Sequence, residues 1–155
     1  MAFKPPPIIH IDTTDNIFEN ADIFEIVPQD VYTSDDLNWT NPNSRVCREH
    51  DDESLRDVPL TSTAVDGWEN YDTVYIGYPI WWFNAPMAIG SFLESYDLSG
   101  KTIVPFCTSQ DNGIDVSMDY IRKNAKNAEV LEGHRIHNSD SAEIKTWLKE
   151  IGTIS

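Results

Sequence analysis

The chain has 155 residues and carries 26 acidic against 11 basic side chains, a formal net charge of −15. This length predicts one domain spanning residues 1–155 with one substantial core. The charge argues against nucleic acid and anionic membrane as partners, because both would be repelled, and it is compatible with a basic protein partner. Acidity that serves only solubility is the alternative.

The cysteines and the hydropathy of the sequence indicate the cellular location of the chain. Cys47 and Cys107 are the only cysteines, and their spacing predicts neither a metal site nor a disulfide framework. The sequence has no apolar run long enough to span a membrane, and residues 1–7 lack the apolar centre of a secretion signal. The cytoplasm is therefore the expected location.

Two strands are predicted near the amino terminus. Ile8–Ile11 can form the first, and Asp22–Val27 alternates apolar and polar side chains before Pro28, as a second strand does. Only residues 13–21 separate them, whereas a parallel crossover with its helix usually takes at least about 10–12 residues. The first helix is therefore expected to be stunted or absent.

The segment from residue 30 to residue 65 is polar and shows little apolar periodicity, so no role follows from its sequence. His50 precedes the acidic run 51–53 within it. We interpret this run as a solvated surface rather than a metal site, because hard cations need a shaped cage of oxygen ligands.

The most informative stretch is residues 71–84. Thr73–Ile76 is β-branched and aromatic, which predicts a buried strand that Gly77 and Pro79 are expected to end. Trp81 and Trp82 follow in a loop. Ligands of open α/β sheets bind where strands give way to loops, and large rings in a loop need something to cover them.

A flat aromatic ligand would cover these rings; the alternative is that the tryptophans fill a core or a subunit contact. Asn84 can cap the next helix, with Ala85 and Pro86 in its first turn. A period of 3.6 residues places four apolar side chains on one face of that helix: Ile89, Phe92, Leu93 and Tyr96.

A second strand-and-loop unit follows. Lys101–Phe106 predicts a fourth strand, and Cys107–Gly113 is a polar loop after it. Cys107 is interpreted as a small buried residue rather than a nucleophile, because the sequence places no cationic partner or helix start beside it.

The carboxyl-terminal part continues the alternation of helix and strand. Residues 114–125 predict a helix with Ile114, Met118, Ile121 and Ala125 on its apolar face, and Glu129–Leu131 predicts a short fifth strand. Asp140 and Glu143 can form the capping box of a last helix, whose buried stripe is Ile144, Trp147, Leu148 and Ile151. His134 and His137 count as surface histidines, since nothing in the sequence completes a metal site; no metal ligand is predicted.

Two motifs resemble those of the flavodoxin-like proteins: Gly77–Trp82 followed by Ala85-Pro86, and Lys101–Ser109. The resemblance extends from Asp22 to Trp147. It implies a three-layer α/β fold, with a parallel five-stranded sheet in the order 2-1-3-4-5, helices on both faces, and flavin mononucleotide (FMN) as cofactor. The residues it places around the flavin are Tyr78, Pro79, Ile80, Trp81, Trp82, Phe83, Asn84, Thr108, Ser109 and Gly113.

The resemblance also implies a phosphate loop near the amino terminus. The family pattern is similar to T/S-x-T-G-N-T, and Thr13, Thr14 and Asn16 keep its hydroxyl and amide chemistry as implied contacts to the FMN phosphate. Asp15 stands where the family has glycine and brings a negative charge, which disfavours a phosphate.

Three functions remain open on this basis. The chain can be an FMN-bearing electron carrier that docks on a basic redox partner. It can be an NAD(P)H-dependent reductase that passes hydride through FMN to a quinone or similar acceptor. Because of the altered phosphate loop, it can also be a flavin-free binding module. The sequence shows no general acid, base or nucleophile constellation that would require an enzyme.

Overall fold

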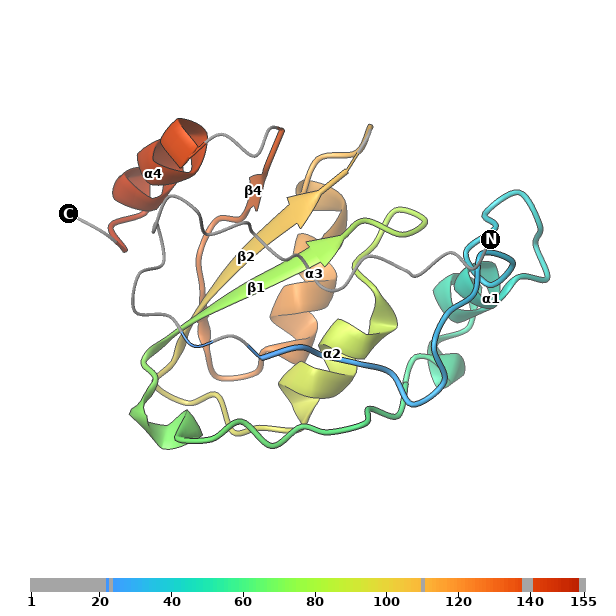
Figure 1. Ribbon diagram of the computed structural model, residues 1–155, viewed down its shortest axis with the longest axis horizontal. Helices are drawn as coiled ribbons and strands as arrows, with labels where there is room; N and C mark the ends of the chain where they lie inside the picture. Colours follow the sequence, from blue (N-terminus) through green and yellow to red (C-terminus); the bar gives the residue numbers. More distant parts are fainter. Residues whose placement is uncertain (1–21, 23, 110, 138–140, 154–155) are drawn as a thin grey trace.

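A parallel sheet between two layers of helices forms the centre of the molecule (Figure 1). The computed structural model describes residues 22, 24–109, 111–137 and 141–153. In this part the sheet has four strands: β1 (Thr73–Pro79), β2 (Thr102–Thr108), β3 (Glu129–Val130) and β4 (His134–Arg135). Every strand pairing is parallel, as predicted.

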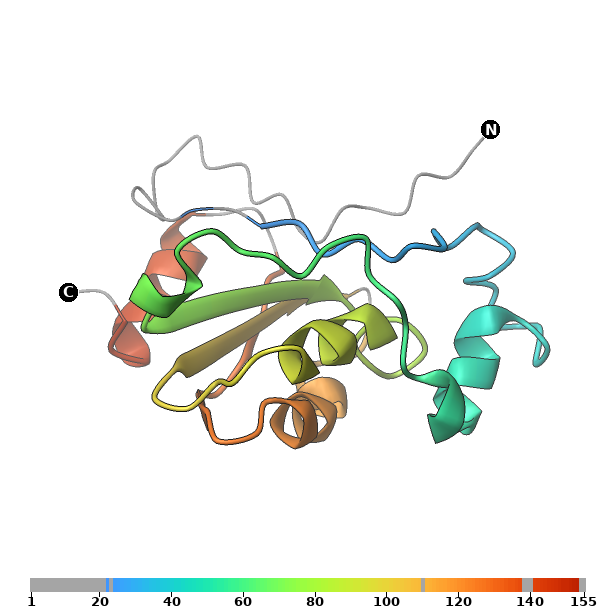
Figure 2. The same ribbon diagram turned by 90° about the horizontal axis from the view of Figure 1, so that it is seen from below.

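Helices cover both faces of the sheet (Figure 2). Helices α2 (Met87–Glu94) and α3 (Asp115–Asn124) lie on one face, and α4 (Ser141–Glu150) lies on the other. Helix α1 (Arg45–Asp51) lies apart from these layers, followed by the 3-10 turns η2 (Glu53–Leu55) and η3 (Trp68–Asn70). This arrangement confirms the predicted three-layer α/β fold. No described helix has the length and apolar character needed to cross a bilayer.

Strand β2 supplies both cores, because its successive side chains point to opposite faces of the sheet. Ile103 and Cys107 join the core under α2 and α3, whereas Val104 and Phe106 join the core under α4. Three side chains of α4 complete the second core, namely Ile144, Trp147 and Leu148. The apolar stripes predicted for the helices are therefore the faces that the sheet buries.

Strand β1 is longer than predicted. It pairs with β2 without a break from Thr73↔Thr102 to Pro79↔Thr108, so Gly77 lies inside the strand rather than ending it. The Thr102 N–H donates to the Asp72 carbonyl at 2.8 Å and the Ile80 N–H donates to the Thr108 carbonyl at 3.1 Å. By this alternation the backbone nitrogen of Pro79 points away from β2. Its lack of an N–H therefore removes no hydrogen bond between β1 and β2.

The predicted fifth strand, Glu129–Leu131, is present as β3, and a further short strand that was not predicted, β4, follows it. Both pair with β2, but residues 131–133 oppose only residues 104–105, so the edge chain carries one extra residue. The Leu131 and Ile136 N–H groups donate to the carbonyls of Ile103 and Cys107. Since Pro105 lies two residues from each of them along β2, its backbone also faces β3 and β4. Because Pro105 has no N–H to donate there, the pairing is interrupted beside it and a bulge forms.

The prediction of a second parallel strand over Asp22–Val27 is wrong for its described residues, 22 and 24–27, which form no ladder with the sheet. This segment instead runs beside residues 57–65 (Figure 2), with an isolated antiparallel bridge between Pro28 and Leu60. Pro59 has no N–H to complete its pair with Gln29, so this pairing does not extend past them into a regular ladder. The alternation still places Ile26 in the core and Phe24 against Phe92.

One helix cap differs from the prediction. Asn84 does not cap α2: its side chain accepts from the adjacent Ala85 N–H, and Pro86 holds the cap position without a side-chain bond. Glu143 accepts from His134 and His137 with its Oε1 atom. The first strand, the stunted first helix, Thr13, Thr14, Asn16 and Asp140 lie outside the described residues.

Gly77 is required where β1 passes Phe106. A Cβ at Gly77 would lie 2.4 Å from the Phe106 ring, which is buried and packs edge-on against Trp147. We expect Gly77→Ala to lower the free energy of unfolding by about 1–3 kcal/mol, because the ring must leave its rotamer. Guanidinium unfolding measures this. In a Phe106→Leu background the same substitution should cost less, and an equal cost in both backgrounds would contradict the ring contact.

Candidate functional site

The carboxyl ends of β1 and β2 lie side by side and bring two loops together. Pro79 and Thr108 form the last pair of the register, and the Ile80 N–H donates to the Thr108 carbonyl at 3.1 Å. Residues 80–84 and 108–113 therefore begin from neighbouring points on one edge of the sheet. Ligands of open parallel sheets bind at this kind of edge.

The first loop is a tight, strained turn. Trp81 and Asn84 exchange both backbone hydrogen bonds, at 2.8 and 3.2 Å. Between them Trp82 and Phe83 have φ values of 48° and 61°. A two-residue turn with positive φ at both positions ordinarily carries asparagine or glycine. Each bulky residue in this conformation costs about 1 kcal/mol or more, and such strain is concentrated at functional sites.

The turn presents aromatic rings to the surface. Trp82 stacks on Trp39, with ring centroids 5.7 Å apart and planes at 14°, and it also contacts Phe83 at 5.0 Å. Phe83 is 50% exposed and Trp39 is 61% exposed. These three residues form what we call the aromatic cluster. Trp81 turns the other way and packs against Tyr32 at 5.0 Å.

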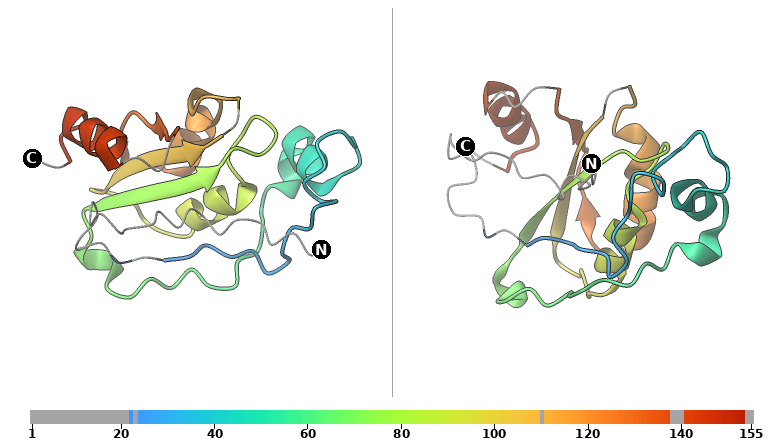
Figure 3. Two further views of the ribbon diagram at one scale, coloured as in Figure 1. Left: turned by 45° about the horizontal axis from the view of Figure 1, so that its top comes forward. Right: turned by 45° about the vertical axis from the view of Figure 1, so that its right-hand side comes forward.

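The segment that the sequence left without a role holds this turn in place (Figure 3). Tyr32 is 2% exposed and donates its hydroxyl to the Glu49 carboxylate on α1. Arg45 donates to Glu49 at 2.8 Å and lies 3.7 Å over the Tyr32 ring. Burial and the bond to Glu49 raise the pKa of Tyr32 well above its usual range, so the phenol stays a neutral donor.

The second loop is supported by a cation from β4. Arg135 donates to the Ser109 carbonyl at 3.0 Å and to the Asp111 carbonyl at 3.3 Å. The Ser109 hydroxyl accepts from the Asn112 N–H at 3.0 Å. Thr108 is exposed, and Gly113 is partly buried before α3 begins. This arrangement leaves Thr108 exposed at the end of β2, beside the turn.

Two polar groups near the site belong to the core. The Tyr78 side chain is fully buried, and its hydroxyl is 2.9 Å from that of Ser117. Burial raises the pKa of Tyr78 above its usual range and that of Cys107 to about 11, although Arg135 acts in the opposite direction on Cys107. The Cys107 thiol is therefore protonated at neutral pH, which agrees with its interpretation as a small buried residue.

The structure thus brings together most of the predicted site residues that it describes. Trp82, Phe83, Thr108 and Ser109 share one edge, whereas Tyr78 and Asn84 are buried beneath it. Trp39, Tyr32 and Arg135 were not predicted. A tryptophan in an otherwise polar segment was the available signal for Trp39, while no local pattern points to Arg135.

This fold defines a three-layer α/β protein, and the edge where its parallel strands end is the candidate ligand site. The family model of flavodoxin matches residues 12–151. The chain belongs to the flavodoxin family. A search of curated proteins found no match.

Solved structures agree with this assignment. A "putative flavoprotein" from Bacteroides eggerthii is 37% identical, with 86% of this chain and 82% of that chain covered and a TM-score of 0.78. A second, from Bacteroides uniformis, is 36% identical over 81% and 80% of the two chains, with a TM-score of 0.73. A flavoprotein in complex with FMN from Lactobacillus acidophilus is 22% identical over 58% and 56%, with a TM-score of 0.42, a likeness too weak to bear on this chain.

The positive φ of Phe83 gives a test of the turn. We expect Phe83→Gly to be more stable than Phe83→Ala by about 1 kcal/mol, because only glycine adopts φ near 61° without strain. Both variants remove the same exposed ring, so their difference in guanidinium unfolding isolates the backbone term. Equal stability would show that the turn relaxes to another conformation when the ring is removed.

Proposed function

We propose that this chain binds FMN at the edge formed by the turn 80–84 and the loop 108–113 and carries electrons. The observation that carries the proposal is the aromatic cluster, two of whose rings, Trp82 and Phe83, are held on a strained turn at the carboxyl ends of two parallel strands. Membership of the flavodoxin family supports it. FMN, when bound, supplies the redox chemistry, and the protein supplies binding and orientation.

The residues at this edge fit a flat, polar-rimmed ring system. Trp82 and Phe83 offer ring faces, and stacking on an aromatic side chain is worth about 1–3 kcal/mol per base in nucleic-acid complexes. Thr108 and Ser109 offer hydroxyl and backbone groups to polar atoms at the rim. Thr13, Thr14 and Asn16 are the groups proposed for the phosphate, on their sequence alone.

A carrier role suits this site better than acid–base catalysis. Burial keeps both Tyr78 and Cys107 protonated at neutral pH, and neither side chain is exposed to a substrate. The exposed ring of Phe83 marks a solvent-facing edge that a partner protein can approach. The net charge of −15 favours a basic partner by electrostatic steering.

The tryptophan on the turn gives the direct test of FMN binding. In a fluorescence titration of the full chain, Trp82→Ala should weaken FMN binding by about 1–3 kcal/mol, roughly fivefold to 150-fold. Trp68→Phe is the matched control. Trp68 lies before β1, at the opposite end of that strand from the turn, and its ring packs against Phe92, Tyr96 and the Lys101 ammonium group. A purified protein without a flavin spectrum that takes up no FMN would overturn the proposal.

Electron transfer can be separated from reductase activity. With FMN bound and reduced by dithionite, the chain should reduce a basic cytochrome at a rate that falls as ionic strength rises, because screening removes the steering of opposite charges. An acidic cytochrome serves as the control and should not show this fall. Steady-state NAD(P)H oxidation by the purified chain would instead favour the reductase.

A further inference from the structure

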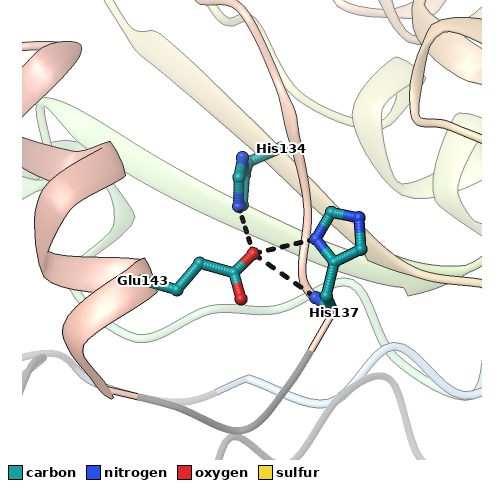
Figure 4. A group of neighbouring side chains, drawn as sticks. All are labelled: His134, His137 and Glu143. Atoms are coloured by element: carbon teal, nitrogen blue, oxygen red, sulfur yellow. Dashed lines mark hydrogen bonds and ion pairs between the residues drawn. The ribbon is translucent and has the colours of Figure 1, made fainter.

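Two histidines and one glutamate meet between β4 and α4 (Figure 4). His134 Nε2 lies 2.7 Å from Glu143 Oε1, and His137 Nδ1 lies 3.1 Å from the same oxygen. One ligand atom from each residue lies within 4.8 Å of the other two. The sequence-based interpretation counts both as surface histidines; the side chain of His134 is partly buried, at 27% exposed.

The fold holds two of these side chains firmly. His134 belongs to β4, and its ring stacks on Trp147 of α4 with centroids 5.2 Å apart and planes at 20°. Glu143 lies in the first turn of α4 and is 23% exposed. His137 follows β4 and is 59% exposed, so it is the member that can move to meet a ligand.

The donor set is one that first-row transition metals prefer. Two imidazole nitrogens and one carboxylate oxygen form a recognised zinc ligand set that leaves a fourth position for water. A tetrahedral zinc with bonds of about 2.0–2.1 Å holds its donors about 3.3 Å apart. The nitrogens lie 2.7 and 3.1 Å from Oε1, and all three ligand atoms lie within 4.8 Å of one another, so small shifts of these side chains would admit a metal.

The charge of the site also suits a cation. Glu143 accepts a hydrogen bond from each imidazole, and a bound metal would replace these imidazole protons. The charge of −15 on the chain also favours accumulation of cations at its surface.

We propose that His134, His137 and Glu143 bind a divalent first-row transition metal, zinc above all, and so tie α4 to the edge of the sheet. This proposal does not depend on FMN binding. The site joins β4, whose Arg135 supports the loop 108–113, to α4. Helix α4 covers the face of the sheet opposite to α2 and α3. Metal binding should therefore stabilise the native state by mass action.

The first test is calorimetric titration of the full chain with ZnCl2 after treatment with a chelator. Wild type should bind one zinc ion, and Glu143→Gln should bind it at least about tenfold more weakly, because even the loss of an outer-shell partner costs 10–100-fold. Glu132→Gln is the matched control for the carboxylate, since Glu132 is exposed and lies 3.4 Å from Arg122. His50→Gln is the control for an imidazole beside a carboxylate, with His50 2.9 Å from Asp51.

His137→Gln keeps the test decisive if a variant at a more buried position fails to fold. His137 is exposed, so this variant should fold, lose the strong zinc binding and lose the rise in melting temperature that zinc gives wild type. With Co2+, wild type should show the intense visible bands of a four-coordinate ion. Zinc binding that is equal in wild type and His137→Gln, or only the weak bands of six-coordinate Co2+, would overturn the proposal and leave a hydrogen-bonded cluster.

Discussion

The parallel pairing of β1 with β2 is the interaction on which the rest of the molecule depends. Its seven-residue register, from Thr73↔Thr102 to Pro79↔Thr108, ends both strands at the same level. The loops that follow consequently start beside each other, and the Ile80 N–H bonds to the Thr108 carbonyl across the gap. Gly77 allows this close pairing, since it leaves room for the Phe106 ring on the α4 side.

A second constraint holds the aromatic turn from outside the sheet. The turn carries bulky residues at positive φ, so packing must offset its strain. Tyr32 and Trp39, from the segment before α1, contact Trp81 and Trp82 and provide that packing. The buried carboxylate of Glu49 in turn fixes Tyr32 through a hydrogen bond. This segment therefore stabilises the turn 80–84 at the candidate flavin-binding edge of the sheet.

Strand β4 connects the two faces of the protein although it is only two residues long. Its side chains alternate, so Arg135 reaches the loop that follows β2 while His134 stacks under α4. The bulge beside Pro105 places both residues in register with Phe106 and Cys107. A shift of one residue would exchange the two side chains between the faces. The missing donor of one proline therefore helps to position groups on both sides of the sheet.

The sequence by itself determined the two central strands, the buried faces of α2, α3 and α4 and the position of the loop that carries large rings, because these follow from local periodicity and residue type. Thr73–Ile76, the apolar stripe of α2 and the loop after Thr102–Thr108 could all be predicted in this way. Only the tertiary structure decided which distant residues meet them. Trp39 stacks on Trp82, which lies 43 positions later in the chain, and Arg135 bonds to Ser109, 26 positions earlier. Glu143 lies between two histidines, the more distant of which is 9 positions away. No local pattern encodes such contacts, since they depend on strand register, on a bulge at a proline and on the packing of separate helices.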